Sequence, residues 1–309
     1  MRWGRKKSWG TVALLLSASI GVVPAGGSTS AAASAGCPVW HERTIAYSLG
    51  ILEALLPDNR GGMLLSSSSH NAIERLTPNG KVKVIAAATA PGQMVWRGDQ
   101  VMFPTGDSFQ AGATDSTNGT LQVLNLDTHK LRTYATGLTM PNGLALDRDG
   151  TAYVTRDLGN GTGITRISAE PGHRVTTNWS KLTDDNGIAI DTATRQMYVD
   201  RTFTTNAPIV RIPMAHPNDT RQIADLARLG GGVTLKWLDD LFMWRHVLYV
   251  PANGGGDLFS YDLHTSQACV IATGLGNPSD VTVGTGYGWR KGALFVCGFD
   301  GTVREFVRS

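Results

Sequence analysis

Side chains with an oxygen donor recur just before short apolar strands in this 309-residue chain. Asn142 lies in "MPNGLALD", Asn186 in "DDNGIAID" and Asp239 in "WLDDLF", while Glu53 precedes the apolar run "ALLP". A single Asn or Asp at the start of a strand is commonly a turn residue that bonds its own backbone. Four such residues at matching points are more than turns require, and carboxylate and amide oxygens are ligands of hard divalent cations. The set therefore predicts a metal site if the fold brings the four side chains together.

Each of these residues opens a repeated unit. A unit has a polar or Gly/Pro entrance, a short apolar strand, a turn rich in Asp, Gly or Arg, and a second apolar strand, which is the pattern of a β-hairpin. Further units begin around Gly92 and Ser279, so six entrances recur at intervals of 39 to 53 residues. Additional strands such as "TLQVLNLD" and "KLRTYATG" follow most hairpins. This period predicts an all-β fold, a six-bladed β-propeller.

One strand is left over at each end of the repeats. "ERTIAYSL", residues 42–49, has no hairpin partner, and "TVREFVRS" leaves the sixth blade one strand short. Pairing these N-terminal and C-terminal strands would close the ring and remove an exposed edge. We therefore expect residues 42–49 to be the outer strand of the last blade and residues 36–309 to form a single domain. The tryptophans expected to pack between blades are Trp96, Trp237, Trp244 and Trp289.

The innermost strand of each propeller blade lines an axial channel, so the entrance residues should converge at the channel mouth. Facing one another without a cation, such side chains would repel or remain unsatisfied. One Glu, two Asn and one Asp provide four oxygen donors with a formal charge of −2, which suits Ca²⁺, while the lack of His and Cys in the set disfavours zinc and copper. We expect Ca²⁺ as the cofactor, with Mg²⁺, Mn²⁺ or Zn²⁺ as alternatives.

The Glu entrance, "PNG", "NGIAID" and "LDD", in this order and at blade spacing, resemble the senescence-marker-protein/gluconolactonase family of six-bladed propellers over about residues 42–307. The resemblance implies a metal, usually calcium, bound at the top of the channel by Glu53, Asn142, Asn186 and Asp239, and hydrolysis of a lactone. It also implies that the metal polarises the carbonyl while Asp239, ligand and base at once, activates water. Asp240 resembles the second member of the Asp-Asn pair of the more distantly related paraoxonases, which makes it either a substrate contact or a structural partner of the site.

The chain departs from the sugar-lactone enzymes of that family at two positions. Met140 stands where those enzymes commonly have Arg, and Gly143 stands where they commonly have Asp. A less polar lactone or ester is therefore as plausible a substrate as a sugar lactone.

Loops that follow the second strands are expected to surround the mouth. They carry the polar residues Ser69, His70, Asp107, Ser108, Arg156, Asp157, Arg201 and Asn253. Arg156 and Arg201 follow equivalent strands of neighbouring blades and are candidates to orient a substrate carboxylate or alkoxide, unless each pairs with a nearby Asp. His70 is a candidate base in a serine-rich turn, with simple solvation as its alternative.

Residues 1–35 have the pattern of a secretory signal peptide. A basic patch precedes the apolar run "TVALLLSASIGVV" and the small residues "AAASAG". Cleavage after Ala35 satisfies the small-x-small rule and predicts a secreted protein. The alternative is a lipid anchor at Cys37, although Ser34 stands where a lipoprotein signal usually has Leu.

Three cysteines remain after the predicted cleavage: Cys37, Cys269 and Cys297. In an oxidising compartment, one disulfide and one free thiol are expected. Joining Cys37 to either of the other two would tie the start of the domain to a point near its end, and the sequence leaves this pairing open.

The formal net charge is only +3, with 17% charged and 41% hydrophobic residues. These values predict a folded domain and give no indication of a nucleic-acid partner. We expect a monomer that acts on a small molecule, with no membrane partner unless Cys37 is lipidated. Two function classes remain: a metal-dependent hydrolase, and a noncatalytic propeller that binds a ligand or protein around a structural calcium.

Overall fold

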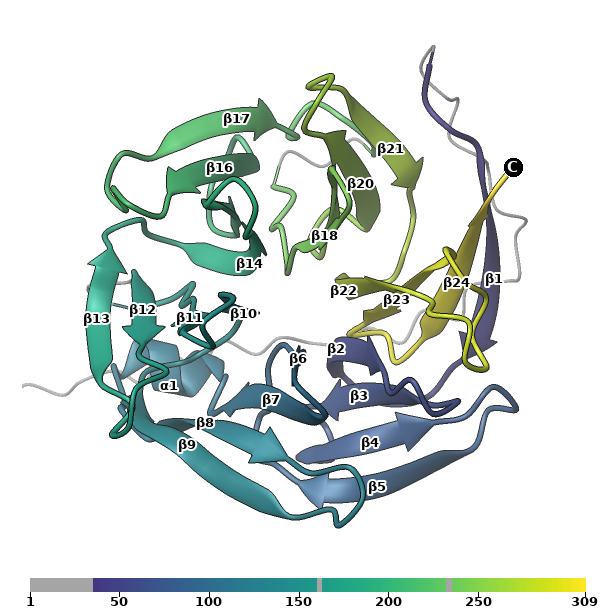
Figure 1. Cartoon of the computed structure of the whole chain (residues 1–309). Coiled ribbons are helices and arrows are strands. Elements are labelled where there is room, and N and C mark those ends of the chain that lie inside the picture. The colour runs from purple at the N-terminus through teal and green to yellow at the C-terminus, as the bar shows by residue number, and fades with distance from the viewer. Residues whose placement is uncertain (1–35, 160–162, 232–234) are drawn as a thin grey trace, which may run out of the picture. The chain divides into compact units, whose positions relative to one another are not determined.

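The computed structural model describes residues 36–159, 163–231 and 235–309, so the predicted signal peptide lies outside the described residues. Six antiparallel sheets of four strands each are arranged around a central axis, as Figure 1 shows. This arrangement is a six-bladed β-propeller, and the fold predicted from the period of the entrances is confirmed. In each sheet, or blade, the inner strand lies nearest the axis and the following strands lie progressively further out. The outer strand of the last blade comes from the N-terminal end of the domain.

The first three blades follow one another along the chain from inner to outer strand. Blade one contains β2 (Leu52–Pro57), β3 (Met63–Ser67), β4 (Ala72–Leu76) and β5 (Val82–Ala87). Blade two contains β6 (Val95–Arg97), β7 (Gln100–Thr105), β8 (Gly119–Leu124) and β9 (Leu131–Leu138), with the short helix α1 (Phe109–Ala113) between β7 and β8. Blade three contains β10 (Leu144–Leu146), β11 (Ala152–Val154), β12 (Ile164–Ile167) and β13 (Val175–Ser180).

The other three blades complete the ring. Blade four contains β14 (Asp185–Asp191), β15 (Gln196–Arg201), β16 (Pro208–Pro213) and β17 (Arg221–Asp225). Blade five contains β18 (Phe242–Trp244), β19 (Val247–Ala252), β20 (Asp257–Asp262) and β21 (Ala268–Ala272). Blade six contains β22 (Pro278–Val283), β23 (Leu294–Gly298), β24 (Val303–Arg308) and β1 (Trp40–Ala46).

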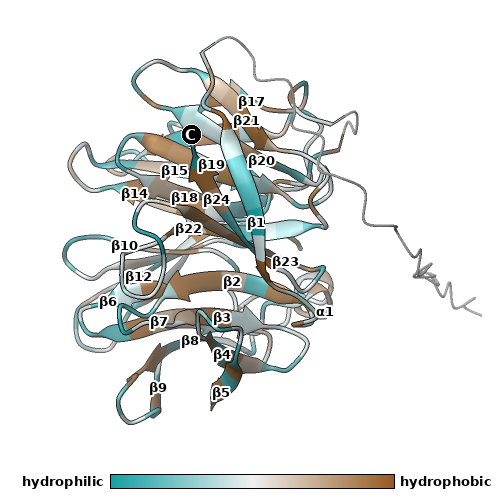
Figure 2. Ribbon diagram, turned by 90° about the vertical axis from the view of Figure 1, so that its right-hand side faces the viewer, coloured by the Kyte–Doolittle hydropathy of each residue, from teal (hydrophilic) through white to brown (hydrophobic). Residues whose placement is uncertain are grey.

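The ring is closed by β1, which pairs antiparallel with β24 as predicted. The strand begins two residues earlier than expected and ends at Ala46, because Ser48 has a left-handed backbone (φ 60°) that turns the chain toward blade one. An ion pair between Arg43 and Glu305 (Nη2 to Oε2, 2.7 Å) links the two strands. Figure 2 shows β1 as largely hydrophilic and β2 as largely hydrophobic, which agrees with the outer position of β1 and the inner position of β2.

Six hydrophobic clusters fill the spaces between consecutive blades. Leu64 and Ile73 of blade one, for example, pack with Val101 and Phe103 of blade two. The cluster between the last and first blades includes Trp289. Because every cluster takes side chains from two sheets, the blades are held together by apolar burial as well as by the closing strand.

One disulfide and one buried ion pair add to this packing in and near blade five. Cys37 forms a disulfide with Cys269 of β21, with 5.7 Å between their Cα atoms, and Cys297 remains a buried free thiol. The sequence left open whether Cys37 pairs with Cys269 or with Cys297, and the structure has the disulfide with Cys269. Lys236 and Asp257 form an ion pair at 2.6 Å (Nζ to Oδ2), with both side chains fully buried.

Candidate metal centre at the channel entrance

Local backbone geometry aims the entrance side chains. In blade one, Leu52 pairs with Ser67 and Ala54 with Ser66, so Glu53 is the extra residue of a β-bulge. Asn186 lies in a similar irregularity of blade four. A bulge bends its strand and redirects a side chain that would otherwise follow the regular alternation. The side chains at these strand entrances therefore turn toward the mouth of the channel.

A left-handed residue comes two positions before the entrance in five blades. These residues are Ala90 (φ 41°), Met140 (38°), Asp184 (60°), Trp237 (45°) and Asn277 (53°). Non-glycine residues seldom adopt this conformation, and its recurrence at one point shows that the passage from one blade to the next requires it. Trp237 lies in a loop with 43% of its surface exposed and belongs to none of the interblade clusters, so the prediction that it packs between blades is wrong.

Glycines after two of the entrance residues allow neighbouring blades to approach closely. A Cβ atom at Gly143 would overlap the carbonyl oxygen of Asn186, and one at Gly187 would overlap the backbone of Asp240. Hydrogen bonds also link neighbouring entrances: the Thr155 hydroxyl donates to the Asn186 carbonyl, and the Gln93 backbone amide donates to the Asn142 carbonyl at 3.1 Å. The Asn-Gly pairs of the sequence thus fix the position of each entrance against the next blade.

Asp239 lies at the centre of a set of amide donors. Its Oδ1 accepts from Asn186 Nδ2 at 3.2 Å, and its Oδ2 accepts from Asn253 Nδ2 at 2.9 Å. Asn186 is itself held in place, because its Nδ2 also donates to the Thr202 hydroxyl at 2.9 Å and its Oδ1 accepts the backbone amide of Asp240 at 3.1 Å. Asp239 is only 6% exposed. The carboxylate is therefore buried with a fixed orientation.

Asn142 and Glu53 approach the same centre from other blades. Asn142 Nδ2 donates to Asp107 Oδ2 at 3.1 Å. The charges of Asp239 and Asp157 act on Glu53, and the charges of Glu53 and Asp157 act on Asp107. The structure thus brings the four predicted ligands to one end of the channel. It adds Asp107 and Asp157 to them, so that the centre contains four carboxyl groups instead of the two expected.

Burial and mutual repulsion raise the pKa values of these carboxyl groups. Burial first, and then the charges of Asp239 and Asp157, hold the pKa of Glu53 well above its usual range. Burial and the charge of Asp157 do the same to the pKa of Asp239, and burial raises the pKa of Asp157 to about 6. The pKa of Asp107 is raised by burial and by Glu53. A nearby cation would relieve this repulsion and favour the ionised forms.

The donor set fits a hard divalent cation. Asp107 Oδ1 and Asp157 Oδ1 are both inaccessible to solvent and have no hydrogen-bond partner. Among the described residues, no Lys or Arg forms an ion pair with Glu53, Asp107 or Asp239. Buried carboxylate oxygens without a donor carry a large desolvation cost, and a cation with oxygen ligands would offset it.

Beyond the entrance, the channel is apolar. A cavity of about 320 Å³ is lined by side chains of the inner strands, among them Leu55, Leu144, Ile188 and Val281. Asp280 is one of the few polar residues in this lining, and its carboxylate accepts the backbone amides of Leu55 (2.9 Å) and Val281 (2.6 Å). Most of the lining is thus apolar, and most of the channel's buried carboxylates lie at the entrance.

The two predicted arginines are both engaged with aspartates. Arg156 forms an ion pair with Asp115, and its Nε donates to the carbonyl of Leu158 at 2.8 Å. Arg201 pairs with Asp184 at 2.9 Å (Nη2 to Oδ2). Both arginines therefore pair with a nearby Asp, which was the alternative to a role in orienting substrate.

The other two predicted substrate contacts lie at different depths. His70 Nδ1 is 2.9 Å from Glu74 Oε1, and about half of the His70 side chain is exposed. Asp240 is 4% exposed, and its Oδ1 accepts the amide of Leu241 at 2.8 Å. Since its own amide donates to Asn186, Asp240 lies beneath the centre and supports it.

Some members of the centre were given no role by the sequence. Asp107, Asp157 and Asn253 were expected only among the loop residues around the mouth. The sequence pattern assigns no role to Asp185 and Asp200, although both are fully buried and the carboxylate of Asp200 accepts the amide of Gly187 at 2.8 Å. The available signal was the position of Asp107, Asp157 and Asn253 within three residues of the ends of the second strands β7, β11 and β19. Asn and Asp are also common in ordinary turns, so only the folded structure distinguishes members of the centre from turn residues.

Comparison with known proteins gives structural neighbours only. No protein-family model matches the sequence, and no curated protein sequence matches it. A gluconolactonase from Xanthomonas campestris is similar in structure, with 17% identity, 93% of this chain and 99% of that chain covered, and a TM-score of 0.67. The virginiamycin B lyase of Staphylococcus aureus is similar with 12% identity, 87% and 98% covered, and a TM-score of 0.56. A chain of the nidogen/laminin complex is similar with 16% identity, 71% and 79% covered, and a TM-score of 0.56.

These neighbours share the propeller fold. The gluconolactonase-type propeller is the architecture that this chain resembles. The neighbours also include a lyase and a protein complex, so the same fold carries different functions and the function must be argued from the site. Within the described ranges, no helix is long and apolar enough to cross a membrane.

Proposed function

We propose that the protein is a metal-dependent hydrolase that acts on a lactone or ester of low polarity at the channel entrance. The observation that carries the proposal is the pair of buried, partnerless oxygens of Asp107 and Asp157 in the same charged cluster as Asp239. The likeness to a gluconolactonase agrees with this reading.

The proposed ligands come from four blades: Glu53, Asn142, Asn186 and Asp239. Asp107 and Asp157 supply additional oxygen donors, which suits the six to eight oxygens that Ca²⁺ takes. A bound divalent cation supplies Lewis-acid polarisation of the substrate carbonyl. Mg²⁺, Mn²⁺ and Zn²⁺ are the alternatives to be tested.

Asp239 is the proposed general base. Its two oxygens each accept one amide hydrogen, from Asn186 and Asn253, and each retains a lone pair that can accept a proton from water. The amides hold the carboxylate in one orientation, so no side-chain ordering is needed at the moment of proton transfer. Asp240 acts through Asn186, because its backbone amide fixes the Asn186 side chain.

Apolar side chains in the loops at the entrance favour a substrate of low polarity. Phe203 follows β15 of blade four and Trp237 precedes β18 of blade five, both at this end of the ring. Their rings form an edge-to-face pair at 6.5 Å, and a little under half of each residue is exposed. Phe109 of α1 is also exposed. Met140, which stands where sugar-lactone enzymes commonly have Arg, is buried against α1. Of the predicted polar contacts, His70 and Arg201 are the more accessible ones for a substrate oxygen.

We also propose that the protein is exported and acts as a monomer. A disulfide between Cys37 and Cys269 is typical of an oxidising compartment. The same sulfur atom of Cys37 cannot also carry a thioether-linked lipid, which favours the secreted form over the anchored form. Intact-mass measurement of the exported protein tests this: a chain that begins at Gly36 without a lipid mass is the expected result.

A hydrolysis assay tests the proposed activity. The metal-stripped protein is assayed on a panel of lactones and aryl esters, with Ca²⁺, Mg²⁺, Mn²⁺ or Zn²⁺ added back. We expect metal-restored turnover that prefers apolar acyl groups and is lost in Asp239→Asn. Asp99→Asn, in the exposed turn between β6 and β7, is the matched control and should retain activity. If no substrate is hydrolysed although Ca²⁺ raises the melting temperature, the noncatalytic propeller with a structural calcium is the better description.

A further inference from the structure

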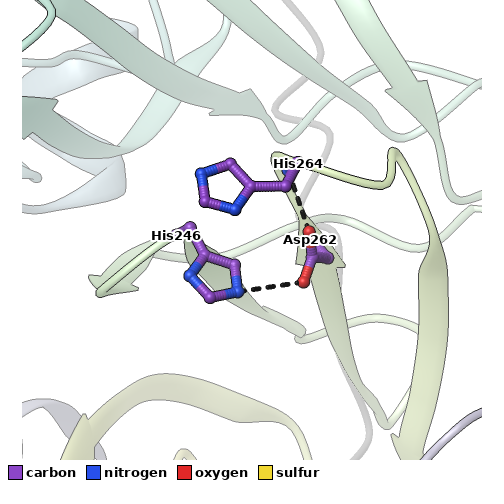
Figure 3. A group of neighbouring side chains, drawn as sticks. All are labelled: His246, Asp262 and His264. Atoms are coloured by element: carbon purple, nitrogen blue, oxygen red, sulfur yellow. Dashed lines mark hydrogen bonds and ion pairs between the residues drawn. The ribbon is translucent and has the colours of Figure 1, made fainter.

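A second group of metal-binding side chains lies in blade five, far along the strands from the channel entrance. His246 is in the turn between β18 and β19, Asp262 ends β20, and His264 is in the turn between β20 and β21 (Figure 3). Both turns are at the opposite ends of their strands from Asp239 and Asn253. The group is therefore separate from the centre described above.

Strand pairing brings the three residues together. Val247 pairs with Asp262, and the amide of Leu263 donates to the carbonyl of His246 at 2.9 Å. The imidazole rings of His246 and His264 stack with their centroids 4.3 Å apart and an interplanar angle of 11°. His246 Nε2 lies 3.2 Å from Asp262 Oδ2. One ligand atom from each residue lies within 4.8 Å of the other two.

The turn holds the carboxylate in position for a ligand. Asp262 Oδ1 accepts the backbone amides of His264 (2.8 Å) and Thr265 (2.9 Å), which leaves Oδ2 directed toward His246. The Cys37 disulfide anchors the next strand at Cys269, so the turn is fixed at its far side as well. Two imidazoles and a carboxylate thus lie within reach of one ion, and a rotation of the stacked rings about their side-chain bonds would direct one nitrogen of each toward it.

Two nitrogen donors and one oxygen donor differ in chemistry from the channel entrance. Imidazole nitrogen suits Zn²⁺, Cu²⁺ and Ni²⁺, whereas Ca²⁺ and Mg²⁺ prefer oxygen alone. Three protein ligands with open positions for water are a common arrangement for zinc. All three side chains are partly or fully exposed, so a hydrated ion can reach them from solvent.

We propose that His246, Asp262 and His264 form a surface site for a divalent transition-metal ion, Zn²⁺ in the first place, which links the two turns of blade five. The site is independent of the proposed hydrolase centre and does not require that proposal to hold. Its sequence spacing is unlike a zinc motif, because the ligands come from two turns 16 to 18 residues apart. Only the pairing of β19 with β20 makes them neighbours.

Zinc titration of the purified, Ca²⁺-saturated protein tests this site. The probes are Zn²⁺ alone, measured by calorimetry, and Co²⁺, whose visible absorption reports coordination by nitrogen. We expect one Zn²⁺ bound per chain and a rise in melting temperature on its addition. His246→Ala and His264→Ala should each weaken binding by about tenfold or more and abolish the rise. Asp262→Asn keeps an acceptor for the turn amides while removing the charged ligand, so its loss of affinity reports ligation and not a disrupted turn.

Two controls separate this site from other metal binding. His216→Ala removes an exposed histidine between β16 and β17 and should leave zinc binding unchanged. Asp239→Asn should also leave it unchanged. Zinc binding that is absent in the wild-type protein, that persists in His264→Ala, or that is lost in Asp239→Asn would each overturn the proposal. In the last case, zinc would be binding at the channel entrance.

Discussion

Replacing Asp157 by Asn separates the stability of the metal-free protein from its affinity for calcium. Asp157 is 6% exposed, and burial raises its pKa from 3.8 to about 6. Because the folded protein holds this proton more tightly than the unfolded chain, stability falls as pH rises from about 4 to about 6 and stays reduced above it. At 1.36 kcal/mol for each pKa unit, the ionised carboxylate costs about 3 kcal/mol at pH 8. Asn removes that cost and weakens the repulsion on Asp239, to which Asp157 contributes.

The expected result is therefore a more stable protein that binds calcium less well. In urea denaturation with EDTA at pH 8, Asp157→Asn should raise the free energy of unfolding by about 1 to 3 kcal/mol, the lower figure allowing for a lost hydrogen bond. At pH 4 the gain should largely vanish, because the wild-type carboxyl is then protonated. Calcium affinity should fall by about 10- to 100-fold.

A control variant tests whether the effect is specific to Asp157, and two results would contradict the prediction. Asp99→Asn also removes one carboxylate, but from an exposed turn, and should change neither stability nor calcium affinity. If Asp157→Asn destabilises the metal-free protein at pH 8, the carboxylate is a structural acceptor and the argument from ionisation is wrong. Unchanged calcium affinity would show that Asp157 takes no part in the metal centre.

Three further predictions concern stability. Lys236→Met leaves the fully buried Asp257 without its partner and should lower the free energy of unfolding by about 3 to 5 kcal/mol, measured by urea denaturation. Reducing the Cys37–Cys269 disulfide should lower it by about 2 to 5 kcal/mol, while Cys269→Ser should become insensitive to reductant. The melting temperature of the metal-free protein should rise as pH falls from 8 to 6. Burial raises the pKa of Asp280 to about 7, so over this range the folded protein takes up a proton that the unfolded chain does not. Saturating Ca²⁺ should diminish this rise.

Much of the fold could be predicted because its signals are local. Alternating apolar residues and turn residues define each hairpin, and the unpaired strands at the two ends predict the closure seen between β1 and β24. The equivalent places of Glu53, Asn142, Asn186 and Asp239 followed from the same period. The boundaries of β1 could not be obtained this way, since they depend on the left-handed turn at Ser48.

Features that depend on contacts between residues distant in sequence could not be predicted. Trp237 is apolar, yet it lies in an exposed loop whose nearest aromatic neighbour, Phe203, is in another blade. The choice of Cys269 over Cys297 depends on which strand lies near the start of β1. The group of His246 and His264 depends on the pairing of β19 with β20. In each case the decisive neighbour is distant in sequence.

The channel entrance shows why a propeller can tolerate a destabilising group of carboxylates. Six interblade clusters, most of whose side chains come from the strands, stabilise the ring together with the closing strand. The bulge at Glu53 and the left-handed residues before the other entrances direct polar side chains to one end, where Asp107 and Asp157 keep buried oxygens without partners. Such an arrangement lowers the stability of the metal-free protein and has no structural benefit of its own. A centre that gains stability only when a cation is bound is the arrangement expected of a functional metal site.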